Sequence, residues 1–171
     1  MNISEPFSGP IDAELVRELF SYDQKTGVFT RIKALHKRSE QFVGKPAGYI
    51  DKSGYGYLKI GNRRVSLHRL AWLHFYGKWP EHEVDHIDGN TSNNAIANLR
   101  DVPHIVNSQN HRQHYSTSTA KFLGVHKHWN KWRACIRVNG KAIHIGLFET
   151  PELASAAFIE KKRQLHRGNT L

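Results

Sequence analysis

One stretch, residues 83–114, constrains the fold more than any other part of the chain. Residues 83–86 (EVDH) predict a short strand, residues 88–90 (DGN) a tight turn and residues 98–102 (NLRDV) a second short extended segment. Pro103 then opens a predicted helix, because proline is well tolerated in a first helical turn. Four polar side chains fall on one face of this helix: Asn107, Asn110, His111 and His114. The order is therefore strand, loop, strand, helix.

The adjacent pair Asp85-His86 carries the chemistry of this unit. A carboxylate is the hard oxygen ligand that Mg²⁺ prefers, and histidine titrates near neutrality, so it can deprotonate an attacking water. Neighbouring strand residues point to opposite faces, so a local distortion, or a backbone carbonyl that orients the ring, is required to bring both to one phosphate. The pair predicts metal-assisted phosphodiester hydrolysis, with a side chain of the following helix completing the ligands.

The sequences DHIDGN, NNAIANLR and VPHIVNSQN together resemble an HNH nuclease of the phage and intron homing type. That resemblance implies a ββα-metal fold, with Asp85 as first metal ligand, His86 as general base and Asn98 as the residue that ties the loop together. It also implies Asn107 as second metal ligand, with Asn110 and His111 as rivals. Mg²⁺ is the expected ion and Mn²⁺ the alternative. Turn and cap roles are expected for Asn93 and Asn94.

Charge supports a nucleic-acid partner. The chain of 171 residues has a formal net charge of +10 and an isoelectric point of about 9.9, which for a globular protein indicates a polyanionic partner. Residues 121–171 contain ten Lys or Arg against three acids, a net +7, while residues 1–120 contain fifteen against twelve, a net +3. The single cysteine, Cys135, excludes a disulfide framework and cysteine-rich zinc sites, so any zinc would have to be held by histidine and carboxylate ligands; no zinc is expected.

The C-terminal third predicts three strands and a helix. Strands are expected at 123–127, 132–138 and 142–148, with a hairpin at Asn139-Gly140, and a helix follows Thr150-Pro151. The sequences LGVHKHWNKWRACIR and IGLFETPELASAAF resemble an AP2 domain, a DNA-binding module whose sheet enters the major groove. Departures at Leu123, His126, His128 and His144 mean that the resemblance implies DNA binding but no recognition sequence. The candidate DNA-binding residues are Trp129, Arg133, Arg137, Lys127 and Lys141.

The remaining sequence predicts a short helix at 11–20 with Asp12 as its cap, a hairpin after it, a loop at 33–48 and a second hairpin around Gly61-Asn62. An amphipathic helix follows from Leu67 and is expected to end at Trp79-Pro80. His68 and His74 lie on that helix as packed histidines, with phosphate contact as the alternative for His68.

These elements predict an α+β chain with a ββα-metal module followed by a three-stranded antiparallel sheet and a helix. The expected domains are residues 1–80 leading into the nuclease, 81–115 as nuclease core, 116–120 as linker and 121–171 as AP2-like domain. No membrane-length apolar run or secretory signal is present, so an intracellular protein is expected, in the bacterial cytoplasm if it is encoded by a phage or intron.

Two functions remain open at this level. The first is a metal-dependent HNH-type DNA endonuclease that acts on double-stranded DNA as a monomer or homodimer, with no protein partner implied. The second is a non-catalytic, sequence-specific DNA-binding regulator, which the intact Asp85-His86 pair disfavours. An RNA-binding module is disfavoured because the aromatic RNP-type strand signature is missing.

Overall fold

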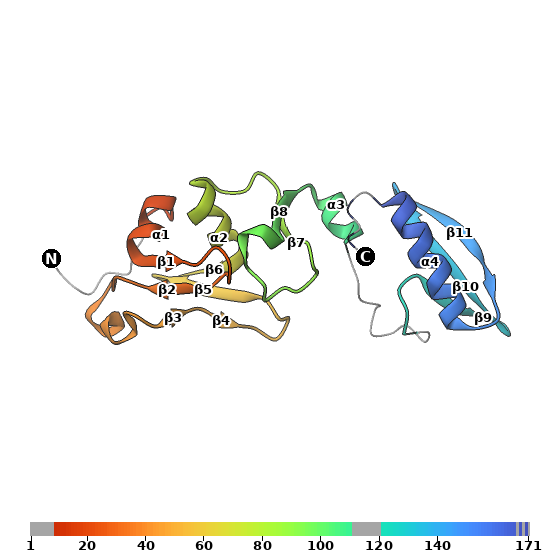
Figure 1. Cartoon of the computed structure of the whole chain (residues 1–171), viewed down its shortest axis with the longest axis horizontal. Helices are drawn as coiled ribbons and strands as arrows, with labels where there is room; N and C mark the ends of the chain where they lie inside the picture. Colours follow the sequence, from red (N-terminus) through yellow and green to blue (C-terminus); the bar gives the residue numbers. More distant parts are fainter. Residues whose placement is uncertain (1–8, 111–120, 167, 169, 171) are drawn as a thin grey trace. The chain divides into compact units, whose positions relative to one another are not determined.

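A computed structural model describes residues 9–110, 121–166, 168 and 170 (Figure 1). The chain divides into two compact units, residues 1–102 and 103–171. Helices and antiparallel sheets occur in both parts, which confirms the α+β class. The predicted domain limits stay predictions, and the linker at 116–120 falls outside the described residues. In the described part of the chain, no helix is long and apolar enough to cross a membrane.

The first unit contains two helices and three small sheets. Its helices are α1 (Ala13–Leu19) and α2 (Leu67–Tyr76), with short 3₁₀ turns η1 (Lys37–Phe42) and η2 (Ile96–Asn98). Two sheets have three strands each: β1 (Phe20–Tyr22), β2 (Phe29–Arg31) and β3 (Pro46–Ala47), then β4 (Tyr49–Ile50), β5 (Gly56–Ile60) and β6 (Arg63–Ser66). The third is the pair β7 (Glu83–His86) and β8 (Leu99–Val102).

One apolar core holds the first unit together. The two helices lie on the same side of β1, β2, β5 and β6 (Figure 1), and α2 packs on β5, β6 and β7. Val16 of α1 and Leu70 of α2 are fully buried in this core, as are Phe20 and Ile60 on the strands. The Arg17 guanidinium also donates to the carbonyl oxygen of His74 at 2.8 and 2.6 Å, which joins α1 to the end of α2. The N-terminal region therefore supports the strand β7, which packs against α2.

Two expectations for this unit were wrong in detail. The segment 33–48 was expected to be a loop but contains η1 and β3, because β3 pairs with β2 through Phe29 and Ala47. The helix α2 ends at Tyr76, before Trp79-Pro80, because Gly77 adopts a left-handed conformation (φ 77°) and its N–H caps the Leu73 carbonyl oxygen. Glycine at this position stops the helix before the proline is reached.

The second unit contains α3 (His104–Gln109), a sheet of β9 (Val125–His128), β10 (Lys131–Val138) and β11 (Lys141–Phe148), and α4 (Pro151–Leu165). The sheet is antiparallel with β10 in the centre, and α4 lies along one of its faces (Figure 1). Thr150 caps α4 by accepting from the Leu153 N–H, with Pro151 in the first turn. This confirms the predicted three strands and helix, and the rest of the predicted helix after Gln109, from 111 to 114, lies outside the described residues.

Candidate active site

The loop between β7 and β8 is organised by Asn98. Its side-chain amide donates to Asp88 Oδ1 at 2.9 Å and to the Asn93 carbonyl oxygen at 2.8 Å, and its Oδ1 accepts from the Asp88 N–H at 2.9 Å. The Asn98 carbonyl oxygen accepts from the Ile87 N–H at 2.8 Å. A single side chain thus joins both ends of the loop, the function that the HNH resemblance assigns to it.

The candidate base, His86, ends β7 and is 3% exposed. Its Nε2 lies 3.2 Å from Asn94 Oδ1, while the Asn94 amide nitrogen donates to the Ser92 carbonyl oxygen at 3.3 Å. With the amide in this orientation, the oxygen of Asn94 faces Nε2 of His86. Burial lowers the pKa of His86 below 6.5 despite the opposing hydrogen bond with Asn94, which favours the neutral base.

Asn94 is the site residue that sequence reasoning missed. It was expected to serve a turn, but it is 3% exposed and its Oδ1 faces the His86 ring. The β1–β2 hairpin holds it in place: the Tyr22 hydroxyl donates to the Asn94 carbonyl oxygen at 2.7 Å, and the backbone of Gly27 packs so closely that a Cβ there would lie 2.3 Å from the Asn94 carbonyl carbon. The segment with several asparagines gave no signal that one of them was buried.

Replacing Asn94 with alanine is expected to lower the rate of DNA cleavage by about 10- to 100-fold, the usual cost of losing a residue that orients a reacting group. The reason is that Nε2 of His86 loses the acceptor that fixes its tautomer. Single-turnover cleavage rates would measure this, with Asn90→Ala as a control on the exposed part of the same loop. Equal rates for Asn94→Ala and the parent would contradict the orienting function.

Asp85 precedes His86 on β7 and is 8% exposed. Arg100 lies directly opposite on β8, and its Nε and Nη2 donate to Asp85 Oδ2 at 2.9 and 2.7 Å. The register of β7 and β8 runs without a shift, so the distortion expected from the adjacent Asp-His pair does not occur. The Asn94 side chain contacts the ring at Nε2, and orientation by a backbone carbonyl stays a prediction.

The two predicted metal ligands belong to different units. Asp85 belongs to the first unit, while Asn107 lies on α3 of the second, so the first unit alone does not bring these two predicted ligands together. The rival Asn110 is 5% exposed and accepts a hydrogen bond from the Thr170 hydroxyl, and His111 lies outside the described residues. Among the described residues, no three His, Cys, Asp or Glu side chains cluster as a metal site. A single buried carboxylate still fits a Mg²⁺-type ion, which keeps waters and takes substrate phosphate oxygens alongside one or two carboxylates.

The sheet of the second unit contains basic side chains but no acidic ones. None of its three strands contains an acidic residue, and the acids of 121–171 lie only on α4 or just before it. Arg133 and Arg137 are exposed on the face of β10 opposite the one that Ala134 and Ile136 bury. Lys127 instead pairs with Trp132 across the strands and lies 4.6 Å over its ring, and Lys141 pairs with Val138, so both fall on the other face. Of the five DNA-binding candidates, the structure therefore groups only the two arginines on one open face.

Trp129 stands apart from both faces. It occupies the turn between β9 and β10 with a left-handed backbone (φ 54°) and is 87% exposed. Trp132, by contrast, packs against the apolar core beneath α4. Of these two tryptophans, only Trp129 is therefore exposed enough to reach a ligand.

Comparison with known proteins agrees with the HNH resemblance of the segment that contains β7 and β8. Residues 65–109, from β6 through α3, match the family model described as HNH endonuclease, which confirms the HNH resemblance for that segment. A solved structure described as DNA binding and cleavage by the HNH homing endonuclease I-HmuI is 31% identical, with a TM-score of 0.43. The match covers 58% of this chain and 55% of the chain in that structure. This chain therefore spans about half the length of that protein. No curated protein matches the chain.

Proposed function

We propose that this protein is a metal-dependent DNA endonuclease of the HNH type, similar to homing endonucleases, that hydrolyses phosphodiester bonds. The observation that carries the proposal is the buried pair of His86 and Asn94, beside Asp85 and within the segment that matches the HNH family model. A neutral histidine held beside a carboxylate suits the function of general base in phosphodiester hydrolysis.

In this mechanism the imidazole of His86 accepts a proton from the attacking water. Asn94 holds the ring throughout, since its Oδ1 continues to accept from Nε2 as the imidazolium forms. Asp85 would hold the divalent ion, Mg²⁺ or Mn²⁺, which when bound would neutralise charge on the scissile phosphate and the leaving oxygen, and Asn107 stays the predicted second ligand. Asn98 keeps the loop closed, so that Asp88 and Asn93 stay fixed beside the base.

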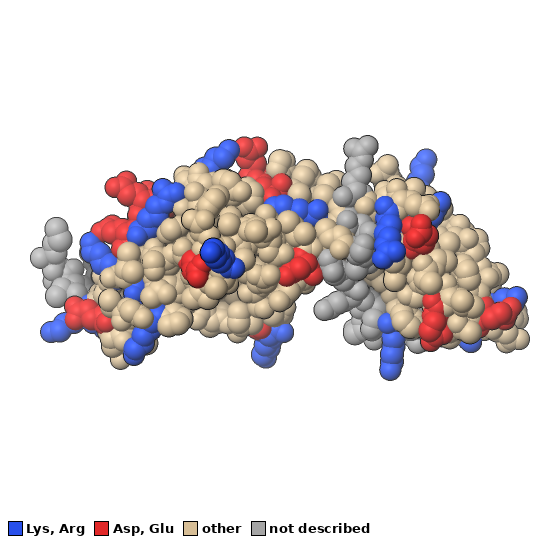
Figure 2. Space-filling model, in the orientation of Figure 1, with Lys and Arg blue, Asp and Glu red and all other residues tan. Residues whose placement is uncertain are grey.

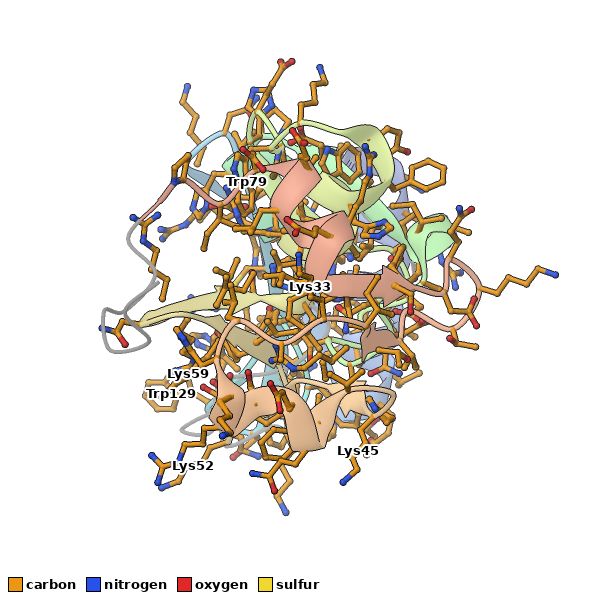
Figure 3. All side chains as sticks on the ribbon, turned by 90° about the vertical axis from the view of Figure 1, so that its left-hand side faces the viewer. Lys33, Lys45, Lys52, Lys59, Trp79 and Trp129 are labelled. Carbon is orange, nitrogen blue, oxygen red and sulfur yellow. The ribbon has the colours of Figure 1, made fainter. Side chains whose placement is uncertain are left out.

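Double-stranded DNA is the proposed substrate. Phosphate contacts are expected from exposed lysines of the first unit, including Lys45, Lys52 and Lys59, which extend from the region of β3 to β5 (Figure 3). The second unit is proposed to bind DNA as an AP2-like module through the open face of its sheet. Figure 2 shows acidic and basic side chains mixed on the side of α4 that faces the reader, whereas the strands of the sheet contain no acidic residue.

The direct test incubates the purified chain with supercoiled plasmid DNA in the presence of Mg²⁺, Mn²⁺ or EDTA. Nicked or linear product with either ion, and none with EDTA, is the expected result. Tight DNA binding without cleavage under any ion would instead favour the non-catalytic regulator.

The open face of the second unit gives a further prediction. The double change Arg133→Ala and Arg137→Ala is expected to weaken DNA binding and to reduce the slope of log K against log salt concentration by about two, since each phosphate contact contributes about 0.9. The pair Lys127→Ala and Lys141→Ala is the matched comparison from the other face, and a smaller change is expected. Fluorescence anisotropy over a salt series measures both, and equal losses for the two pairs would contradict the assignment of the open face.

A further inference from the structure

The helix α3 is packed against two residues that follow α4, Gly168 and Thr170. The Gly168 N–H donates to Gln109 Oε1 at 3.0 Å, and the Thr170 hydroxyl donates to Asn110 Oδ1. Gly168 also lies so close to the helix that a Cβ on it would be 2.1 Å from the Val106 carbonyl oxygen. Two residues therefore contact three positions in and next to α3, and all five belong to the second unit.

These contacts fall on one side of the helix. Val106, Gln109 and Asn110 follow one another at helical spacing, which places them on the same face. Asn110 is 5% exposed there, whereas Ile105, on another side of α3, is 53% exposed. Asn107 comes one position after Val106 and so lies about 100° further round the helix axis. The contacts that set the rotation of α3 therefore also set the direction in which the predicted metal ligand Asn107 points.

A helix as short as α3 needs support from the surrounding fold. It has six residues, and its N-cap is Pro103, whose side chain makes no capping hydrogen bond. Isolated helices shorter than about 12 residues are marginal in water, and most helical stability in proteins comes from tertiary packing. The contacts of Gly168 and Thr170 are packing of this kind. Removing them is therefore expected to loosen α3.

We propose that Gly168 and Thr170 are positioning residues of the nuclease, which hold α3 in the orientation that presents Asn107 to the divalent ion. The inference rests on the proposed function, in which Asn107 is the second metal ligand, while its structural part concerns the free protein. It assigns the rival ligand Asn110 to anchoring the helix, because the Asn110 side-chain oxygen accepts from Thr170. The second unit then contributes to cleavage itself and not only to DNA affinity.

A DNA-binding tether and a support for α3 give different kinetics. If the second unit only raised the local concentration of DNA, changes at Gly168 or Thr170 would leave kcat at saturating DNA unchanged. If these residues hold the helix that carries a metal ligand, kcat and metal affinity fall together. DNA affinity stays, because both residues lie outside the strands β9 to β11 that form the proposed DNA-binding face.

The first measurement is amide hydrogen exchange on the full chain, free of metal and DNA. The backbone N–H groups of Val106, Asn107 and Asn110 donate to carbonyl oxygens in and next to α3, so their exchange reports its opening. Thr170→Val keeps the size of the side chain but removes the hydroxyl, and it is expected to speed exchange of these amides by about 10-fold. Thr170→Ser keeps the hydroxyl and is expected to exchange like the parent. Amides in β10 are expected to exchange at the parent rate in both variants, because the loosening is local.

Cleavage, Mn²⁺ binding and DNA binding are measured on the same variants. Thr170→Val is expected to lower kcat and Mn²⁺ affinity by about 10- to 100-fold each, with the dissociation constant for DNA in EDTA changed by less than about twofold. Gly168→Ala is expected to act in the same direction, because the added Cβ meets a backbone oxygen of α3. The matched control is Gly140→Ala in the hairpin between β10 and β11, where the added Cβ meets open space. Its left-handed backbone (φ 78°) makes alanine cost stability, but α3 exchange, kcat and Mn²⁺ affinity are expected to match the parent.

Two results would overturn the proposal. One is a Thr170→Val protein whose α3 amides exchange as in the parent, because the contact then does not hold the helix. The other is faster exchange in α3 together with the kcat and Mn²⁺ affinity of the parent, because the orientation of α3 then does not matter for the metal. If Gly168→Ala does not fold, the pair Thr170→Val and Thr170→Ser decides alone. A parent that does not cut DNA would defeat the nuclease function, and hydrogen exchange with Mn²⁺ titration would still decide whether these residues hold α3.

Discussion

Replacing His86 with alanine is expected to abolish DNA cleavage while leaving DNA binding intact. A positioned general base contributes about 10²- to 10⁴-fold to a rate, so the residual activity should fall below detection in a plasmid assay. Binding should survive because His86 is 3% exposed and is not one of the basic side chains proposed to contact phosphates. Single-turnover cleavage and fluorescence anisotropy on the same preparation separate the two effects.

The control for this variant is His82→Ala. His82 lies just before β7 with its side chain half exposed. Its backbone N–H donates to Asp101 Oδ1 at 2.9 Å, and alanine at this position keeps that hydrogen bond. Its cleavage rate is expected to stay close to that of the parent. Cleavage by His86→Ala at the rate of His82→Ala would remove His86 from the mechanism.

The second large effect is expected for Asp85→Asn. The amide keeps the size of the side chain but removes the charge that a divalent ion requires, so cleavage should be lost and metal binding weakened. The substitution also leaves the Arg100 guanidinium without its carboxylate, and loss of stability must be measured separately by thermal unfolding. Isothermal titration with Mn²⁺ reads metal binding without any need for activity.

Asp101→Asn provides the comparison for Asp85→Asn on the neighbouring strand. Asp101 accepts from the backbone N–H groups of Glu81 and His82 at 2.7 and 2.9 Å, so it stabilises the start of β7. Asp101→Asn should cost stability but leave Mn²⁺ affinity unchanged. Equal Mn²⁺ affinity in Asp85→Asn and the parent would contradict the assignment of Asp85 as a metal ligand.

Strong local signals made much of the fold predictable from sequence. Three features follow from the conformational preferences of residues within a single turn: the Asp12 cap, the hairpin at Gly61-Asn62 and the start of α4 at Thr150-Pro151. Each of these elements occurs where it was expected. β3 and η1 escaped prediction because β3 is defined by pairing with a distant strand. The left-handed Gly77 ended α2 earlier than the proline, since capping by glycine acts at the first suitable residue.

The candidate site was predictable only where residue type determines function. Asp85 and His86 stand out by their chemistry, and Asn98 by its place in the HNH motif. Asn94 does not stand out, because it is singled out by a contact with His86 that only the fold brings about. Lys127 shows the same limit in the second unit. The register of β9 and β10 places Lys127 on the face of Trp132, and the number of basic residues in the sequence does not predict that register.

The central claim is that a neutral His86 acts as the base, and the pH dependence of single-turnover cleavage at saturating Mg²⁺ tests it most directly. Because burial lowers the pKa of His86, the active neutral form predominates above a pH that lies below 6.5. The rate is therefore expected to rise with pH in the acid range and to level off before or near pH 6.5, with this dependence missing in His86→Ala. A rate that falls as pH rises through this range, or an identical profile in His86→Ala, would contradict the account.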